Sequence, residues 1–159
     1  MNTFPSPAVR RSTKYQAGVA AIECALLLPI LIAFLMMGFF IASIFWHYTM
    51  AQKAAQDAAR YLSTVSVSEM MTPASALAAG NLAKEIIRRE IAEVSPSSEI
   101  GILETFCDTS TCGGKLPGTV PTTVRVNFSI SMFDPFGVID TGWYGLPISA
   151  NYTMRYVGN

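Results

Sequence analysis

The chain has 159 residues, 51% of them hydrophobic, and its 11 basic and 11 acidic side chains leave it without net charge. This length allows one modest domain plus an anchor. The basic residues form no surface patch, which argues against a nucleic-acid-binding protein. No phosphate-binding loop or nucleophile motif is present either, so we expect a non-catalytic protein that needs no cofactor.

The N-terminus is a basic leader. Residues 1–16 are rich in Pro, Ser and Thr, and they carry Arg10, Arg11 and Lys14 but no acidic residue. This composition predicts a disordered segment. Because short basic flanks of membrane helices stay in the cytoplasm, we expect the leader inside the cell and the chain beyond residue 46 outside the inner membrane.

An uncharged apolar run follows the leader and extends from Cys24 to Trp46. A helix of this length measures about 34 Å and spans a bilayer core of about 30 Å. The run is too long for a cleaved secretory signal, and Glu23 stands where a lipoprotein signal needs a small residue. A carboxylate at the start of a membrane helix is costly, so we expect Glu23 to have a partner or a task. A plain signal anchor is the alternative.

Two features inside the run concern helix assembly. Pro29 cannot donate a hydrogen bond to the carbonyl group of Ala25. It marks either a kink used in assembly or one of the prolines that membrane helices tolerate. Gly38 and Ala42 have the spacing of a seam between membrane helices, although such small-residue pairs are common.

Helical periodicity starts near Ala17 and does not stop at the end of the apolar run. Beyond it, small and apolar residues recur at three- and four-residue spacing with polar residues between them. This pattern predicts that the membrane helix projects outward as an amphipathic stalk. The recurring residues are Ala51, Ala54, Ala55, Ala58, Ala59, Leu62 and Val65.

A second helix is predicted over residues 74–94. The pattern breaks at residues 66–72 and restarts with Thr72 as N-cap and Pro73 at the first helical position. Ser95-Pro96 ends the helix. Its expected apolar face consists of Ala79, Leu82, Ala83, Ile86, Ile87, Ile91 and Val94.

Beyond Pro96 the apolar period changes to two. Residues 124–132 and 148–156 alternate between apolar and polar side chains, which predicts two antiparallel strands with one buried face. A third, less regular strand is expected near residues 100–106. The predicted fold class is therefore α+β, with the second helix packed on a small antiparallel sheet.

The three cysteines have different surroundings. Cys107 and Cys112 bracket a short polar loop, which favours a local disulfide in an oxidising compartment. A metal site is the alternative, but the only histidine, His47, lies at the membrane boundary and makes a poor third ligand. Cys24 is interpreted as a small apolar helix residue. Further on, Phe133, Phe136, Trp143 and Tyr144 form either a docking surface or the core of a folded loop.

Three short sequences resemble the TadE-like family of tight-adherence (type IVc) pilus proteins. They are Gly18-Val-Ala-Ala-Ile-Glu23, then Cys-Ala-Leu-Leu-Leu-Pro29, and Ala-Gln-Asp-Ala-Ala-Arg-Tyr61. The family pattern is E-x-A-L-x-x-P followed by A-x-x-A-A-R. The residues that match it are Glu23, Ala25, Leu26, Pro29, Ala55, Ala58, Ala59 and Arg60, and the resemblance covers residues 17–62.

The resemblance implies processing by a prepilin peptidase between Gly18 and Val19. Glycine gives a protease close access to the backbone. The new amine of Val19 is then a positive charge that pairs with Glu23 of the same or a neighbouring helix and sets the axial register. Cys24 departs from the pattern, because members with this signal tend to have an aromatic residue there.

The resemblance also implies a structural, non-catalytic role as a minor pilin or pseudopilin. The expected parts are the leader 1–18, a membrane helix and stalk 19–67, and a periplasmic head 68–159. The implied partners are the prepilin peptidase, the major pilin, other minor pilins and the inner-membrane secretion platform. The protein would serve cell adhesion as a single-pass protein of the bacterial inner membrane, and it could also enter the pilus. The alternative is a membrane-anchored periplasmic binding module that never enters a filament.

Overall fold

The computed structural model describes residues 14–96, 98–134, 142 and 145–159. The chain divides into two compact units, residues 1–39 and 40–159, and helix α1 (Lys14–Thr64) contributes to both. Of the predicted leader, residues 1–13 lie outside the described residues. Helix α1 begins at Lys14, slightly before the expected start near Ala17.

The first unit consists of the N-terminal part of α1. Its side chains from Gly18 to Phe39 are almost all exposed, and the helix continues through Pro29. The segment from Gly18 to Thr64 is long and apolar enough to cross a membrane. A helix that is apolar on all sides needs lipid or other helices around it.

The second unit contains the rest of α1 and two further helices. Helix α3 (Pro73–Val94) has Thr72 as its N-cap residue and Pro73 at its first turn, which confirms the helix predicted from the sequence. The expected break at residues 66–72 contains one short helix, α2 (Val67–Met70). Its first turn is capped by Ser66, whose Oγ accepts a hydrogen bond from the backbone N–H of Glu69 at 3.4 Å.

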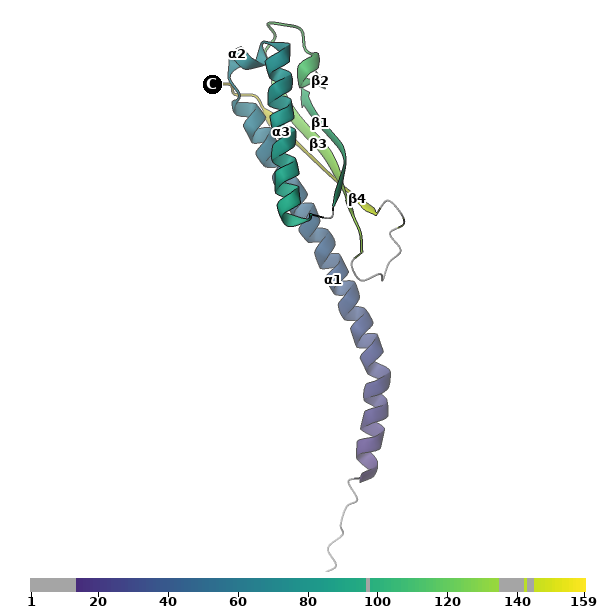
Figure 1. The fold of residues 1–159 in the computed structure, drawn as a ribbon. Coiled ribbons are helices and arrows are strands. Elements are labelled where there is room, and N and C mark those ends of the chain that lie inside the picture. Colours follow the sequence, from purple (N-terminus) through teal and green to yellow (C-terminus); the bar gives the residue numbers. More distant parts are fainter. Residues whose placement is uncertain (1–13, 97, 135–141, 143–144) are drawn as a thin grey trace, which may run out of the picture. The chain divides into compact units, whose positions relative to one another are not determined.

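The sheet is antiparallel and has the strand order β2-β1-β3-β4 (Figure 1). The long strands β3 (Thr123–Met132) and β4 (Leu146–Arg155) pair in the register that sets Phe128 opposite Ala150. Strand β1 (Glu99–Cys107) has a register shift between Ile100 and Leu103, which explains its irregular apolar pattern. Strand β2 (Ser110–Thr111) and the 3-10 turn η1 (Cys112–Gly114) were not foreseen. The predicted α+β fold class is confirmed.

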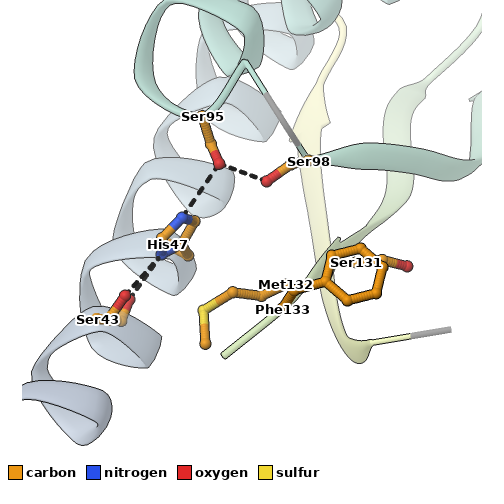
Figure 2. A pocket seen from close by; sticks show the side chains of 7 residues that line it. All are labelled: Ser43, His47, Ser95, Ser98, Ser131, Met132 and Phe133. Carbon is orange, nitrogen blue, oxygen red and sulfur yellow. Dashed lines mark hydrogen bonds between the residues drawn. The ribbon is translucent and has the colours of Figure 1, made fainter. Parts of the chain in front are cut away.

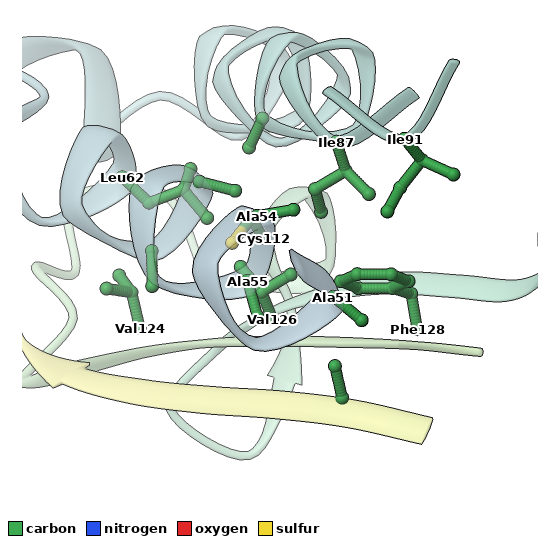
Figure 3. Packing of buried hydrophobic residues seen from close by; sticks show 14 of the residues in the cluster. Ala51, Ala54, Ala55, Leu62, Ile87, Ile91, Cys112, Val124, Val126 and Phe128 are labelled. Atoms are coloured by element: carbon green, nitrogen blue, oxygen red, sulfur yellow. The ribbon is translucent and has the colours of Figure 1, made fainter. Parts of the chain in front are cut away.

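The core of the second unit is built around the regularly spaced small residues of α1. All seven of the residues from Ala51 to Val65 that recur in the sequence are buried. Figure 3 shows the alanines of this stripe between the isoleucines of α3 and the side chains of Val126 and Phe128 on β3. The helix that leaves the apolar run is therefore built into the head, and its stripe packs against the head's own sheet.

Helix α3 differs from its predicted apolar face in one detail. Leu82 is 49% exposed, whereas Gly80 is buried. A Cβ atom on Gly80 would lie 2.8 Å from Oγ1 of Thr105 on β1, so the glycine permits the close approach of α3 to the sheet. The close contact at Gly80, and not the apolar side chain of Leu82, decides which side of this turn of α3 faces the sheet.

The C-terminus closes the open end of α1. The backbone N–H groups of Val157 and Gly158 donate to the carbonyl oxygen of Ser63 at 3.1 and 3.2 Å. The hydroxyl of Tyr156 donates to the carbonyl oxygen of Val65 at 2.7 Å. Carbonyl groups at a helix C-terminus lack partners inside the helix, so these bonds satisfy the end of α1 and fasten the last strand to it.

The alanine stripe yields a test of the packing. Ala55→Leu adds volume where the exposed fraction is zero, and overpacking of this kind lowers the free energy of unfolding by about 1–3 kcal/mol. Gln56→Leu, at the neighbouring exposed position, should change it little. Chemical denaturation of the detergent-solubilised protein, followed by circular dichroism, measures both. Equal stability of the two variants would contradict the burial of the stripe.

Candidate functional site

The predicted processing residues lie on the first unit's exposed helix. Val19 is 58% exposed, and Glu23 is also exposed. Because both residues are helical and four positions apart, they lie one turn apart on the same face of α1. The structure therefore brings Val19 and Glu23 together on one helix face, as pairing of a new Val19 amine with Glu23 requires. Cleavage itself stays a prediction.

Neither glycine of this helix has a packing reason within the described residues. A Cβ atom added at Gly18 or at Gly38 would meet no other atom within 4 Å. Glycine inside a helix is less favourable than alanine by about 1 kcal/mol. Both glycines thus lower the stability of the helix without making a close contact to another described residue, which favours an interaction with another molecule. The assembly roles of Gly38, Ala42 and Pro29 stay predictions.

The two head cysteines form the disulfide predicted from the sequence. The Cys107–Cys112 bridge has an S–S distance of 2.06 Å and a Cα–Cα distance of 4.6 Å. Both residues are buried, and the bridge joins the end of β1 to η1. Cys24 is exposed on α1 and takes no part in a disulfide.

Asp108 organises the loop that the disulfide closes. Its Oδ1 accepts hydrogen bonds from the backbone N–H groups of Thr122 and Thr123 at 2.8 and 2.9 Å and from the Thr122 hydroxyl at 2.7 Å. Its Oδ2 lies 2.6 Å from Nζ of Lys115. Partial burial alone would raise the pKa of Asp108, but the hydrogen bonds from Lys115, Thr122 and Thr123 together hold it well below its usual value of 3.8.

The backbone at Asp108 has a positive φ of 59°, a conformation that Asp and Asn adopt more readily than most residues. Sequence analysis did not identify this residue. The sequence did contain a signal, namely an aspartate directly after the first cysteine of a short loop. Aspartate side chains in such loops accept hydrogen bonds from nearby backbone groups.

His47 connects α1 to the junction between α3 and β1 (Figure 2). Its Nδ1 lies 2.8 Å from the carbonyl oxygen of Ser43, so this nitrogen donates. In neutral His47 the Nε2 is then the acceptor for the hydroxyl of Ser95 at 3.2 Å, and Ser95 in turn is hydrogen-bonded to Ser98. His47, which sequence analysis considered a poor metal ligand, therefore links two elements of the head through hydrogen bonds.

A small pocket of about 160 Å³ opens beside His47. It is lined by Ser43, His47, Ser95, Ser98, Ser131, Met132 and Phe133. A serine hydroxyl next to a histidine is also a pairing used in nucleophilic catalysis. Here Nδ1 of His47 donates to the backbone carbonyl oxygen of Ser43, and the Ser95 hydroxyl is also hydrogen-bonded to Ser98. This arrangement suits a structural link between α1 and the end of α3. Among the described residues, no three His, Cys, Asp or Glu side chains lie close enough to hold a metal ion.

Most of the aromatic group that sequence analysis singled out cannot be placed. Phe136, Trp143 and Tyr144 lie outside the described residues, and only Phe133 is seen, 45% exposed at the end of β3. The choice between a docking surface and a folded loop core stays open.

The sequence profile of the TadE-like protein family matches residues 18–60 of the chain. The match begins at Gly18 and includes the alanine stripe up to Arg60, so it covers most of α1 and none of the sheet. No curated protein and no solved structure matches the chain significantly.

Asp108 generates a prediction on acid stability. Because its pKa is lower in the folded than in the unfolded protein, its contribution is complete above the unfolded value near 3.8 and is lost as the pH falls below that value toward the folded pKa. Asp108→Asn keeps an acceptor and tolerates the positive φ, but it cannot ionise. The variant should be less stable than the parent at pH 7, and it should lose less stability than the parent between about pH 5 and pH 2. Chemical denaturation of both proteins at each pH measures the difference.

Parallel acid profiles for the parent and the variant would show that the carboxylate is not a stabilising anion. A thiol assay on the denatured, unreduced variant serves as the control. It verifies that the Cys107–Cys112 bridge has formed, so that any change comes from the carboxylate.

Proposed function

Because residues 18–60 are TadE-like, we propose that the protein is a minor pilin or pseudopilin that acts in the assembly of a tight-adherence (type IVc) pilus. The role is structural and non-catalytic. The observation that carries the proposal is the coincidence of the matched segment with an exposed apolar helix whose C-terminal part is built into a disulfide-bonded head. The protein is anchored in the bacterial inner membrane by that helix, with its head in the periplasm.

Cleavage after Gly18 would change the electrostatics of Glu23. In the uncut chain α1 begins at Lys14 and has no acidic residue in its first turn. After cleavage the helix would begin at Val19, and Glu23 would stand about one turn from its positive end. Acidic side chains near a helix N-terminus are stabilised by about 0.3–1 kcal/mol, and the new amine adds a full positive charge. Processing would therefore give the exposed carboxylate of Glu23 a positively charged partner.

Assembly would use the surface that the chain leaves uncovered. From Gly18 to Phe39 the helix exposes apolar side chains on all sides, and Gly38 offers a place for close backbone approach. Equivalent helices of the major pilin and of other minor pilins fit such a surface, and the secretion platform and prepilin peptidase meet it in the membrane. In the described part of the head, the alanine stripe belongs to the same buried core as the side chains of the sheet.

Processing is tested at the N-terminus of the protein. In cells with an active prepilin peptidase, sequencing of the membrane-extracted chain should begin at Val19, and without the peptidase at Met1 or Asn2. Gly18→Arg should block the cut, because a bulky charged side chain prevents the backbone from approaching the active site of the prepilin peptidase. Gly18→Ala, which keeps a small uncharged residue at the same position, is the matched control and should still be cut. An intact leader in peptidase-competent, piliated cells would remove the processing step.

Assembly is tested separately at Glu23. Glu23→Ala should leave cleavage intact but reduce the number of pili, because the Val19 amine loses its charged partner. Cys24→Ala, the adjacent exposed position, is the matched control and should assemble pili normally. Counting pili by electron microscopy in a deletion strain complemented with each variant measures the effect. Normal piliation in the deletion strain would contradict the assembly role and favour an anchored binding module outside the filament.

A further inference from the structure

An apolar groove lies at one end of the head, between α1 and the beginning of β4. Its volume is about 410 Å³, and its walls are Ile44, Phe45 and Tyr48 on one side and Leu146, Pro147, Ile148 and Ser149 on the other. Phe45 is 63% exposed and Leu146 is 37% exposed. No lining residue is charged. The neighbouring pocket at His47 has four serines and a histidine in its wall, so it is more polar than the groove.

The α1 wall of the groove belongs to the apolar run. Ile44 and Phe45 precede Trp46, the last residue of the uncharged segment that begins at Cys24. Tyr48 follows two positions after Trp46, and amphipathic aromatic rings such as those of Trp46 and Tyr48 settle at the membrane–water interface. Leu146 and Pro147 line the same groove, so the first residues of β4 lie level with the end of the apolar run.

The backbone of β4 at this level carries one donor fewer than elsewhere. In the sheet of the described residues β4 is an edge strand. Tyr156 donates its N–H to Thr122, and because antiparallel pairs alternate, residues 147, 149, 151, 153 and 155 direct their backbone groups to the open edge. Pro147 has no N–H group, so the residue nearest the end of the strand presents no unpaired donor there. An unpaired donor is costly where water is scarce.

From these observations we propose that the groove is a lipid-contacting surface. The end of the head sits in the interfacial layer of the membrane that α1 enters, and lipid acyl chains near the headgroups occupy the space between Phe45 and Leu146. Ile44 and Phe45 belong both to the apolar run and to the wall of the groove, and this is what favours lipid over another protein. This inference rests on the proposed insertion of α1, and it places the head directly on the bilayer without a free stalk below it.

The test uses single cysteines labelled with an environment-sensitive nitrobenzoxadiazole fluorophore. All variants carry Cys24→Ala, keep the Cys107–Cys112 bridge, and are full-length chains in vesicles of phosphatidylethanolamine and phosphatidylglycerol. Leu146→Cys and Ser149→Cys report on the groove, and the second substitution changes the size of the side chain less. Thr153→Cys is the matched control, because it is exposed on the same strand and the same edge, about 14 Å beyond Ser149. Ala33→Cys reports on the apolar run.

Nitroxide-labelled lipids should quench the fluorophores at positions 33, 146 and 149 several-fold more strongly than the one at 153, and aqueous iodide should show the opposite order. If position 33 is quenched by lipid while 146 and 149 behave like 153, the proposed insertion stands and the lipid-contacting surface is wrong. If position 33 is not quenched by lipid, the insertion fails and the inference fails with it. Shielding of 146 and 149 from iodide without quenching by lipid would show a protein in the groove and would also overturn the proposal.

Discussion

The close approach of α1 to the rest of the head is the constraint on which the second unit depends. It is possible because the side chains that α1 directs inward from Ala51 to Ala59 are methyl groups, with Leu62 and Val65 filling the wider space at the end of the helix. Protein interiors are packed at nearly the density of organic crystals, so even one added methylene group lowers the stability. A second close approach, at Gly80 on α3 and Thr105 on β1, completes the same arrangement. Withdrawal of α1 would expose the apolar faces of both α3 and β3.

Polar tethers hold this packing in place at three separate points. His47 ties α1 to Ser95, Asp108 gathers Lys115 and two threonines beside the disulfide, and Tyr156 closes the end of α1. Partial burial, together with the nearby charge of Glu69, raises the pKa of Tyr156, so its hydroxyl keeps the proton that it donates to Val65. Among the described residues, no buried side-chain nitrogen or oxygen lacks a hydrogen-bond partner. The described part of the head thus satisfies its buried polar side chains with its own residues.

The two units have opposite needs. The head buries most of its apolar residues, whereas the segment from Gly18 to Phe39 exposes them and carries two glycines that no contact with another described residue requires. A segment of this kind is stable only in lipid or among other helices. The division fits the proposed role, in which a folded head is carried by a helix whose surface is available first to the membrane and then to a filament.

Sequence alone determined the features that depend on local periodicity. The alternation of β3 and β4, the repeat of small residues in α1, the start of α3 at Pro73 and the spacing of Cys107 and Cys112 are all patterns within a single element or loop. The TadE-like resemblance is likewise a linear motif, which is why it points to processing at Gly18 and Val19 and to a task for Glu23. Strand β2 and helix α2 escaped prediction because elements of 2 and 4 residues are too short to show a period.

Tertiary structure decided what depends on residues distant in the sequence. His47 and Ser95 are 48 positions apart, and Asp108 and Thr122 are 14 apart, so no local pattern couples either pair. The exposure of Leu82 and the burial of Gly80 follow from the distance at which α3 meets β1. The groove needs Phe45 and Leu146 side by side. Such contacts form only when the chain has folded, because their free energy comes from partners that the sequence keeps far apart.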